Sequence, residues 1–170
     1  MKKTIIVGGA PVPLSASAGA LIHYKKQFGT EYIEDYEELK ALSEDPNAQA
    51  VVFSQIALRL LWAMAAAADR NIAPFDDWII RFEAAALLDA ITEAQEIFVS
   101  ALSRVKESGS GENYSSERMI AQALLCGLSV DDLDGLPLSM VIDTFEEWCK
   151  AKGYSEDDAR PATQEDFDNF

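Results

Sequence analysis

The chain has 170 residues, of which 49% are hydrophobic, and this is enough apolar material for one domain with or without a smaller attached unit. The formal net charge of −15 argues against binding to nucleic acid or anionic lipid, because both repel an acidic surface. A single histidine excludes His-rich metal sites and paired-histidine mechanisms, and we interpret Cys126 and Cys149 as reduced, buried thiols rather than a disulfide.

Residues 4–14 predict a β-hairpin with Gly8-Gly9 as its turn. Pro11 and Pro13 cannot donate hydrogen bonds to a ladder, so the second strand must be an edge strand or frayed. The apolar stretch in this N-terminal segment is too short to be the h-region of a signal peptide. The longest unbroken apolar stretch, residues 60–68, is too short to span a bilayer, and we expect a soluble, cytoplasmic protein.

Two helices are predicted after the hairpin. The first begins at Ser15 or Ser17 and ends before Gly29, which suits a helix C-terminus. The second is capped by Thr30 and spans residues 31 to about 42.

Residues 50–68 are apolar on almost every side, which predicts a central, buried helix that carries Trp62. Trp78 lies near the start of the next helix, which opens at Phe75. For both tryptophans we favour packing in the core, and the alternative is a partner-binding groove around them.

A further helix is predicted between Leu87 and Val105. Its apolar positions are spaced four and three apart, as in a coiled-coil seam: Leu87, Ile91, Ala94, Phe98, Ala101 and Val105. We favour packing of this seam within the chain, and the alternative is contact with a partner helix or a second copy.

Residues 107–115 are rich in Gly and Ser and predict a flexible linker. Short helical segments follow at 116–125, at a Ser129/Asp132 capping box, and after Pro137. In the last of these we expect the following side chains to point inward: Leu138, Val141, Phe145 and Trp148.

The fold class expected from these elements is mainly α with a small N-terminal β-hairpin (α+β). We expect a helical domain over residues 1–106, the linker over 107–115, and an acidic helical extension with a docking tail over 116–170. The charge balance differs between the parts: 14 acidic and 10 basic residues over 1–106, against 15 acidic and 4 basic over 107–170. The extension is either a surface for basic proteins or a solubilising segment.

The last nine residues form a candidate binding segment. Thr163 and Asp166 fit a capping box, and Phe167 and Phe170 lie three apart on one helical face. An isolated helix needs roughly 12–15 residues to be even marginal in water, so this segment requires a docking surface on its own chain or on a partner.

The sequence nominates no catalytic, cofactor-binding or metal-binding residue. His23 fits a helix-surface or packed residue better than a catalytic base, and Gly8-Gly9 lacks the ending of a phosphate loop. Asp132 and Asp134 precede Gly135 as in a calcium loop, but valines occupy the first and last ligand positions. We therefore expect a binding protein and not an enzyme.

Several of these segments resemble a known family. The buried helix with Leu60-Leu61-Trp62-Ala63-Met64, followed by Phe75-Asp76-Asp77-Trp78, looks like the N-terminal domain of tail assembly chaperones from long-tailed phages and prophages. Residues 125–129, 132–134, 136–143 and 162–170 are similar to the C-terminal extension of the longer chaperone form. The two resemblances together cover most of the chain.

The resemblance implies two partners and no cofactor. The N-terminal domain would coat the tape-measure protein, and the extension, which a translational frameshift often appends near the linker, would recruit tail-tube subunits in the bacterial host cytoplasm. From the residues themselves, the candidate partner-binding positions are Trp62, Trp78, Phe98, Thr163, Asp166, Phe167 and Phe170, and the seam allows self-association. A rival hypothesis, which rests on charge alone, is an acidic inhibitor or nucleic-acid mimic that occupies a basic cleft.

Overall fold

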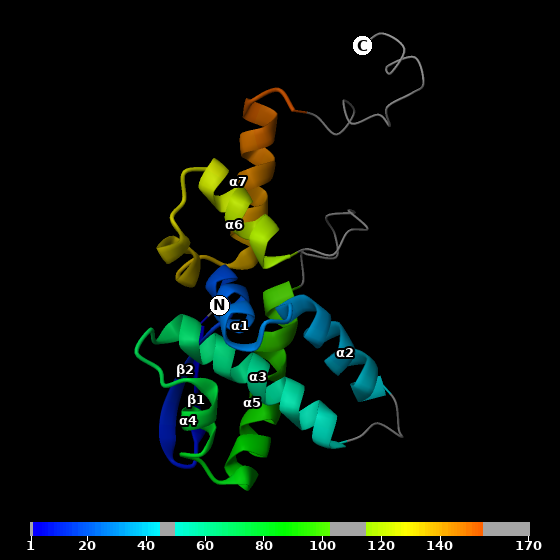
Figure 1. Ribbon diagram of the computed structural model, residues 1–170, viewed down its shortest axis with the longest axis vertical. Helices are drawn as coiled ribbons and strands as arrows, with labels where there is room; N and C mark the ends of the chain where they lie inside the picture. Colours follow the sequence, from blue (N-terminus) through cyan, green and yellow to red (C-terminus); the bar gives the residue numbers. More distant parts are fainter. Residues whose placement is uncertain (1, 45–49, 103–114, 155–170) are drawn as a thin grey trace.

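The computed structural model describes residues 2–44, 50–102 and 115–154 (Figure 1). Its elements, in chain order, are β1 (Lys2–Val7), β2 (Ala10–Ser15), α1 (Ala18–Phe28), α2 (Tyr32–Glu44), α3 (Ala50–Ala68), α4 (Phe75–Ile79), α5 (Ala84–Leu102), α6 (Ser116–Leu125), the 3-10 helix η1 (Val130–Asp134) and α7 (Leu138–Ala151). The predicted fold class, mainly helical with a small N-terminal hairpin, is confirmed.

The hairpin has the turn that the glycines predict. Gly8 and Gly9 have φ values of 57° and 84°, the left-handed conformation that a two-residue type I′ turn requires. Side chains alternate across the strands, so that Ile5 and Val12 are buried against the helices while Pro11 and Pro13 are exposed. The sheet has two strands, so the second strand is an edge strand, as its prolines predict.

The first helix, α1, has the predicted ends, whereas α2 does not have the predicted cap. α1 follows Ser17 and ends at Gly29, whose φ is 75° and whose N–H donates to the carbonyl of Lys25. α2 begins at Tyr32, and the Thr30 hydroxyl donates to the carboxylate of Asp35 at 3.1 Å. The helix thus begins one residue later than predicted, and Thr30 lies two residues before its first residue.

The central element is α3, as its apolar composition predicts. It contacts α1, α2, α5 and β2, and its residues from Ile56 to Ala67 are mostly buried. Among the described helices, α3 alone is long and apolar enough to cross a membrane, and 56% of its most apolar window is buried inside the fold. The core helix of a folded domain has the same length and apolar composition as a membrane-spanning helix, and the burial of α3 fits such a core helix.

The seam predicted on α5 packs within the chain. Leu87, Ile91, Ala94 and Phe98 are buried, and α5 contacts both α3 and β1. Val105 lies outside the described residues, as does most of the predicted linker. Ser115, the last residue of that linker, is the N-cap of α6 and accepts the backbone N–H of Arg118.

The C-terminal unit, residues 115–154, consists of α6, η1 and α7 and rests on α1 (Figure 1). The predicted capping box is present in both halves: the Ser129 hydroxyl accepts the Asp132 N–H, and the Asp132 carboxylate accepts the Ser129 N–H. Gly127 and Gly153, with φ values of 82° and 81°, follow the ends of α6 and α7.

One prediction for α7 is wrong. Leu138 and Val141 are buried in the shared core as expected, but Phe145 and Trp148 are only half-buried and are not among the side chains packed against that core. The second half of α7 extends past the elements that could cover it, so these rings contact each other instead.

Candidate partner-binding surfaces

The described residues contain no group of three or more His, Cys, Asp or Glu side chains that could hold a metal ion. Cys126 and Cys149 are free and half-buried. Burial, followed by the neighbouring Cys149, raises the pKa of the Cys126 thiol, which disfavours the thiolate, the nucleophilic form of cysteine.

Three residues that the sequence nominated for partner binding lie in the core. Trp62, Trp78 and Phe98 are 5%, 4% and 3% exposed, on α3, α4 and α5 respectively. The Trp62 ring meets Phe28 edge-on at 5.7 Å, and its Nε1–H donates to the carbonyl of Ala73 at 3.0 Å. This is the core packing that we favoured for the tryptophans, so these rings present little surface to a partner.

The other nominated residues form the C-terminal segment: Thr163, Asp166, Phe167 and Phe170. All four lie outside the described residues. Their role in binding therefore stays a prediction from the sequence.

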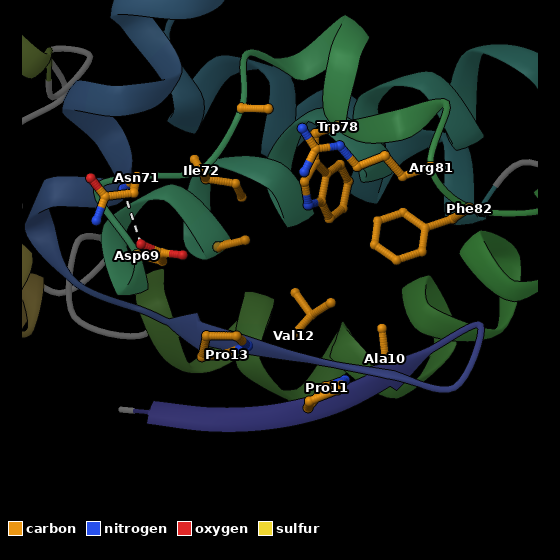
Figure 2. Close-up of a pocket in the computed structure, with 12 residues that line it drawn as sticks. Ala10, Pro11, Val12, Pro13, Asp69, Asn71, Ile72, Trp78, Arg81 and Phe82 are labelled. Carbon is orange, nitrogen blue, oxygen red and sulfur yellow. Dashed lines mark hydrogen bonds between the residues drawn. The ribbon is translucent and has the colours of Figure 1, made fainter.

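A cavity of about 210 Å³ lies between β2 and the chain that joins α3 to α4 (Figure 2). Val12 and the ring of Trp78 face each other across it, and Arg81 and Phe82 lie at its side. Pockets that hold drug-sized ligands are usually about 300–1,000 Å³. The cavity is therefore suited to one or two side chains of a partner rather than to a cofactor.

Three aromatic rings form a stack at the end of α7. The rings of Phe145 and Trp148 are 6.0 Å apart and 14° from parallel, and those of Trp148 and Tyr154 are 6.2 Å apart and 21° from parallel. The ammonium group of Lys152 lies 5.9 Å from the centre of the Trp148 ring. Aromatic stacking and a cation–π contact thus fix a surface that the core does not cover.

A glycine turn places the last ring of this stack. The Gly153 N–H donates to the carbonyl of Lys150, and the Tyr154 N–H donates to that of Cys149. This is the Schellman pattern that ends many helices, and it turns the chain back so that Tyr154 lies over Trp148. Tyr154 remains 64% exposed.

We call the stacked rings of Phe145, Trp148 and Tyr154 the distal apolar surface. Phe145 and Trp148 lie on α7, which extends away from the hairpin (Figure 1). Two further apolar residues of the C-terminal unit are exposed: Leu124 and Leu125, at 56% and 55%, lie at the end of α6, which packs beside α7.

Acidic side chains border the distal apolar surface. Glu146 and Glu147 on α7 are exposed, and Glu147 pairs with Lys150 at 2.6 Å. A large exposed apolar patch rimmed by polar residues is typical of protein–protein interaction sites. This surface could not be predicted from the sequence, because a helical apolar stripe does not reveal which part of it the fold leaves uncovered.

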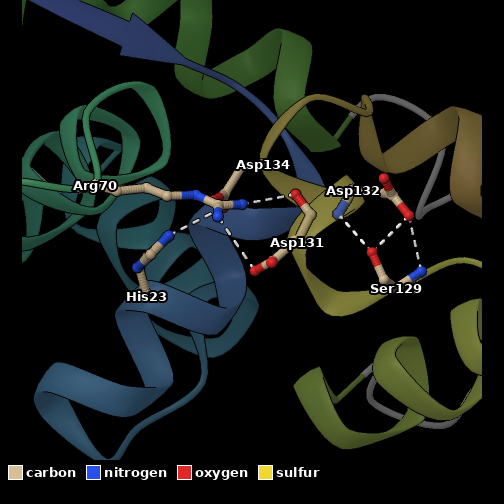
Figure 3. A network of polar contacts seen from close by, with 6 residues as sticks. All are labelled: His23, Arg70, Ser129, Asp131, Asp132 and Asp134. Carbon is tan, nitrogen blue, oxygen red and sulfur yellow. Dashed lines mark hydrogen bonds and ion pairs between the residues drawn. The ribbon is translucent and has the colours of Figure 1, made fainter.

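At the opposite end, the C-terminal unit is attached to the N-terminal helices by a polar network (Figure 3). The carboxylate of Asp134 accepts from Arg70 Nε at 2.7 Å and lies 3.0 Å from His23 Nε2. Arg70 also donates from Nη2 to the carbonyl of Asp131 at 2.8 Å. His23 is thus a packed, partnered residue, which is one of the two interpretations that the sequence favoured.

Backbone contacts reinforce the attachment. The Ala18 N–H at the start of α1 donates to the carbonyl of Leu136 at 2.9 Å. A Cβ on Gly19 would lie 2.1 Å from Asp134 Oδ1 and 2.8 Å from its Cα, so only glycine permits this approach. Ser116 Oγ and N donate to the Glu31 carboxylate at 2.8 and 3.1 Å. The described part of the extension is therefore docked on α1 and on Glu31, which lies just before α2.

Comparison with known proteins finds no match: no protein-family model, no curated protein and no solved structure is similar to this chain at a significant level.

Proposed function

We propose that this protein is a non-enzymatic tail assembly chaperone of a long-tailed phage or prophage, acting in the bacterial cytoplasm, that binds the tape-measure protein and recruits tail-tube subunits. The observation that carries the proposal is the distal apolar surface on an acidic C-terminal unit. The family resemblance supports it through segments in both parts of the chain.

The distal apolar surface has the properties of a subunit-binding site. Its aromatic rings provide large contact areas with few rotatable bonds, which lowers the entropic cost of binding. Its acidic border favours a partner with Lys and Arg around an apolar patch, because complementary charge speeds encounter and selects partners. We assign this surface to the tail-tube subunit.

The N-terminal region is assigned to the tape-measure protein. A long helical chain exposes apolar stripes until the tail tube encloses it, and a chaperone must cover those stripes reversibly. The cavity beside Trp78 could admit a side chain of such a helix, and Leu88 and Ile80, which are 52% and 79% exposed, add apolar area to the same region of the chain.

The proposal is tested by calorimetry, which measures the affinity of the full chain for the tail-tube protein of the same phage or prophage. Trp148→Ala should weaken binding by at least tenfold, because truncation of a central aromatic commonly costs about 2 kcal/mol or more. Ile80→Ala changes an equally apolar, exposed residue elsewhere and should leave the affinity unchanged. Unchanged binding of Trp148→Ala would contradict the assignment.

The C-terminal phenylalanines provide a second test. If the last segment docks on the tube subunit, the double change Phe167→Ala with Phe170→Ala should weaken the same affinity. Intact binding would rule out the docking role of this segment.

The rival hypothesis, an acidic inhibitor or nucleic-acid mimic, predicts a different pattern. Its binding through residues 107–170 should fall steeply with ionic strength and should not depend on Trp148, because charge would supply most of the affinity. Measurement of both variants at low and high salt therefore separates the two functions.

A further inference from the structure

The two edges of the hairpin differ in the hydrogen-bonding groups that they present. Val7 and Ala10 flank a two-residue turn and therefore form a hydrogen-bonded pair. Hydrogen-bonded and non-hydrogen-bonded pairs then alternate along an antiparallel register. Residues in the non-hydrogen-bonded pairs direct their N–H and C=O groups away from the neighbouring strand. The non-hydrogen-bonded pairs in this hairpin include Ile6 with Pro11 and Thr4 with Pro13.

The outer edge of β2 is closed to further strands. Pro11 and Pro13 occupy the positions whose N–H groups would point outward, and proline has no N–H to donate. This edge also faces the cavity and the chain around Trp78 (Figure 2). A strand that paired with this edge of β2 would lack the hydrogen bonds that the N–H groups of residues 11 and 13 would otherwise donate.

The outer edge of β1 is open. Thr4 and Ile6 keep their N–H groups, and among the described residues no backbone hydrogen bond reaches either of them from outside the hairpin. Ile6 is 57% exposed, and Thr4 beside it is also exposed. An unpaired strand edge of this kind is a template for pairing with another strand.

We propose that β1 pairs with β1 of a second copy of this chain, antiparallel and across a two-fold axis. The two hairpins would then form one continuous sheet in the order β2, β1, β1 of the second copy, β2 of the second copy. This goes beyond the proposed function, because it requires neither the tape-measure protein nor the tube subunit.

The sequence of β1 is complementary to itself in this arrangement. With the axis at Thr4, each Thr4 faces the other Thr4, and Lys2 faces Ile6 of the second copy. Threonine pairs are favourable across strands, and the aliphatic stem of a lysine can cover an isoleucine. No lysine of the outer face is placed opposite a lysine, and the contact is isologous, as in most homodimers.

The prolines also limit the size of the assembly. Once the two β1 edges are paired, the remaining edges are those of the two β2 strands, both closed by Pro11 and Pro13. Pairing therefore stops at two copies instead of continuing into a fibre.

The direct test is sedimentation equilibrium of the full chain over a wide range of concentration. A strand-edge contact buries a small area, so we expect a monomer–dimer equilibrium with Kd ~100 µM. Amide exchange of Thr4 and Ile6 should slow as concentration rises, whereas Ile5, which bonds within the hairpin, should not change. A monomer at ~1 mM, or exchange that does not depend on concentration, would overturn the proposal.

Two variants test the interface. Thr4→Pro removes the N–H group at the centre of the proposed interface, so the dimer should be absent at every concentration. The hairpin should accept this change, because the facing residue, Pro13, is already a proline. Ile6→Lys leaves the backbone unchanged but places a lysine opposite Lys2 of the second copy, and should weaken the dimer several-fold. Ile80→Lys, at a more exposed apolar position outside the hairpin, is the matched control and should not change Kd. Undiminished dimer in the first two variants would exclude β1 as the interface.

The dependence on salt distinguishes strand pairing from a contact between charges. Each copy carries a net charge of −15, so added NaCl should screen the repulsion and strengthen β1 pairing. If salt instead weakens association, the lysines of β1 are binding an acidic segment of the second copy, and the strand-pairing proposal fails.

Discussion

The N-terminal region, residues 2–102, and the C-terminal unit, residues 115–154, are held together by different means. The first surrounds α3, whose side chains from Leu60 to Ala67 are at most 5% exposed. The second contributes fewer buried side chains to the shared core, and hydrogen bonds and ion pairs to α1, Glu31 and Arg70 add to its attachment. The N-terminal region should therefore unfold as a whole, while the C-terminal unit can detach first.

The largest effect is expected in the centre of the N-terminal region. Leu61 is fully buried on α3, and Leu61→Ala should lower the free energy of unfolding by about 2–5 kcal/mol. Leu88→Ala, at a position 52% exposed on α5, should change it by about 0.5 kcal/mol or less. Urea denaturation followed by circular dichroism measures both. Similar losses for the two variants would contradict the description of α3 as the core.

The next largest effect should break the attachment of the C-terminal unit. Gly19→Ala adds a Cβ where only 2.1 Å separates it from Asp134 Oδ1, and the clash should exceed the roughly 1 kcal/mol that alanine gains in a helix. We expect amide protection to fall in α6 and α7 but not in α3, measured by hydrogen exchange. Gly135→Ala is the control, because its Cβ would lie 3.5 Å from the nearest atom. Equal protection in α6 and α7 of Gly19→Ala would refute close docking at this position.

A smaller effect is expected for Arg70. Its side chain is 52% exposed, so Arg70→Ala should weaken the attachment by only about 1 kcal/mol, with His23 still beside the Asp134 carboxylate. Arg70→Lys keeps the charge but not the planar fork and should fall between wild type and alanine. Hydrogen exchange of α7 again measures the loss, and an unchanged rate for Arg70→Ala would show that the attachment depends on the other contacts and not on Arg70.

The smallest effect concerns pH. Burial by itself would raise the pKa of Glu31, but hydrogen bonds from Lys25 and Ser116 lower it overall below its ordinary value of 4.5. A lowered pKa stabilises the folded form above the unfolded value, and this stabilisation is lost as the pH falls from about 4.5 through the lowered pKa. Amide protection of α6 should therefore decrease in that window. In Glu31→Gln the pH-dependent component should disappear, and its persistence would point to another group.

Local features of the fold could be predicted because neighbouring residues encode them. The Gly8-Gly9 turn, the end of α1 at Gly29 and the Ser129/Asp132 capping box each depend on contacts within a few residues. The predicted cap at Thr30 was wrong by one residue: α2 begins at Tyr32, and the Thr30 hydroxyl donates to the side chain of Asp35, five residues away.

Long-range contacts could not be predicted in this way. The contact of His23 with Asp134 joins residues 111 positions apart, and no local pattern marks it. Phe145 and Trp148 continue the apolar stripe of Leu138 and Val141, yet the core ends before it reaches them. The sequence indicates which face of α7 is apolar, whereas the length of the neighbouring elements decides how far that face is covered.

The length of α7 has a consequence for the geometry of binding. The helix begins beside the attachment on α1, and its 14 residues rise about 21 Å along its axis. The helix therefore acts as a rigid spacer, and the chain continues from Tyr154 at its far tip. Whatever is captured there is held at a set separation from anything bound to the hairpin end, so that this protein could fix the distance between two partners as well as bring them together.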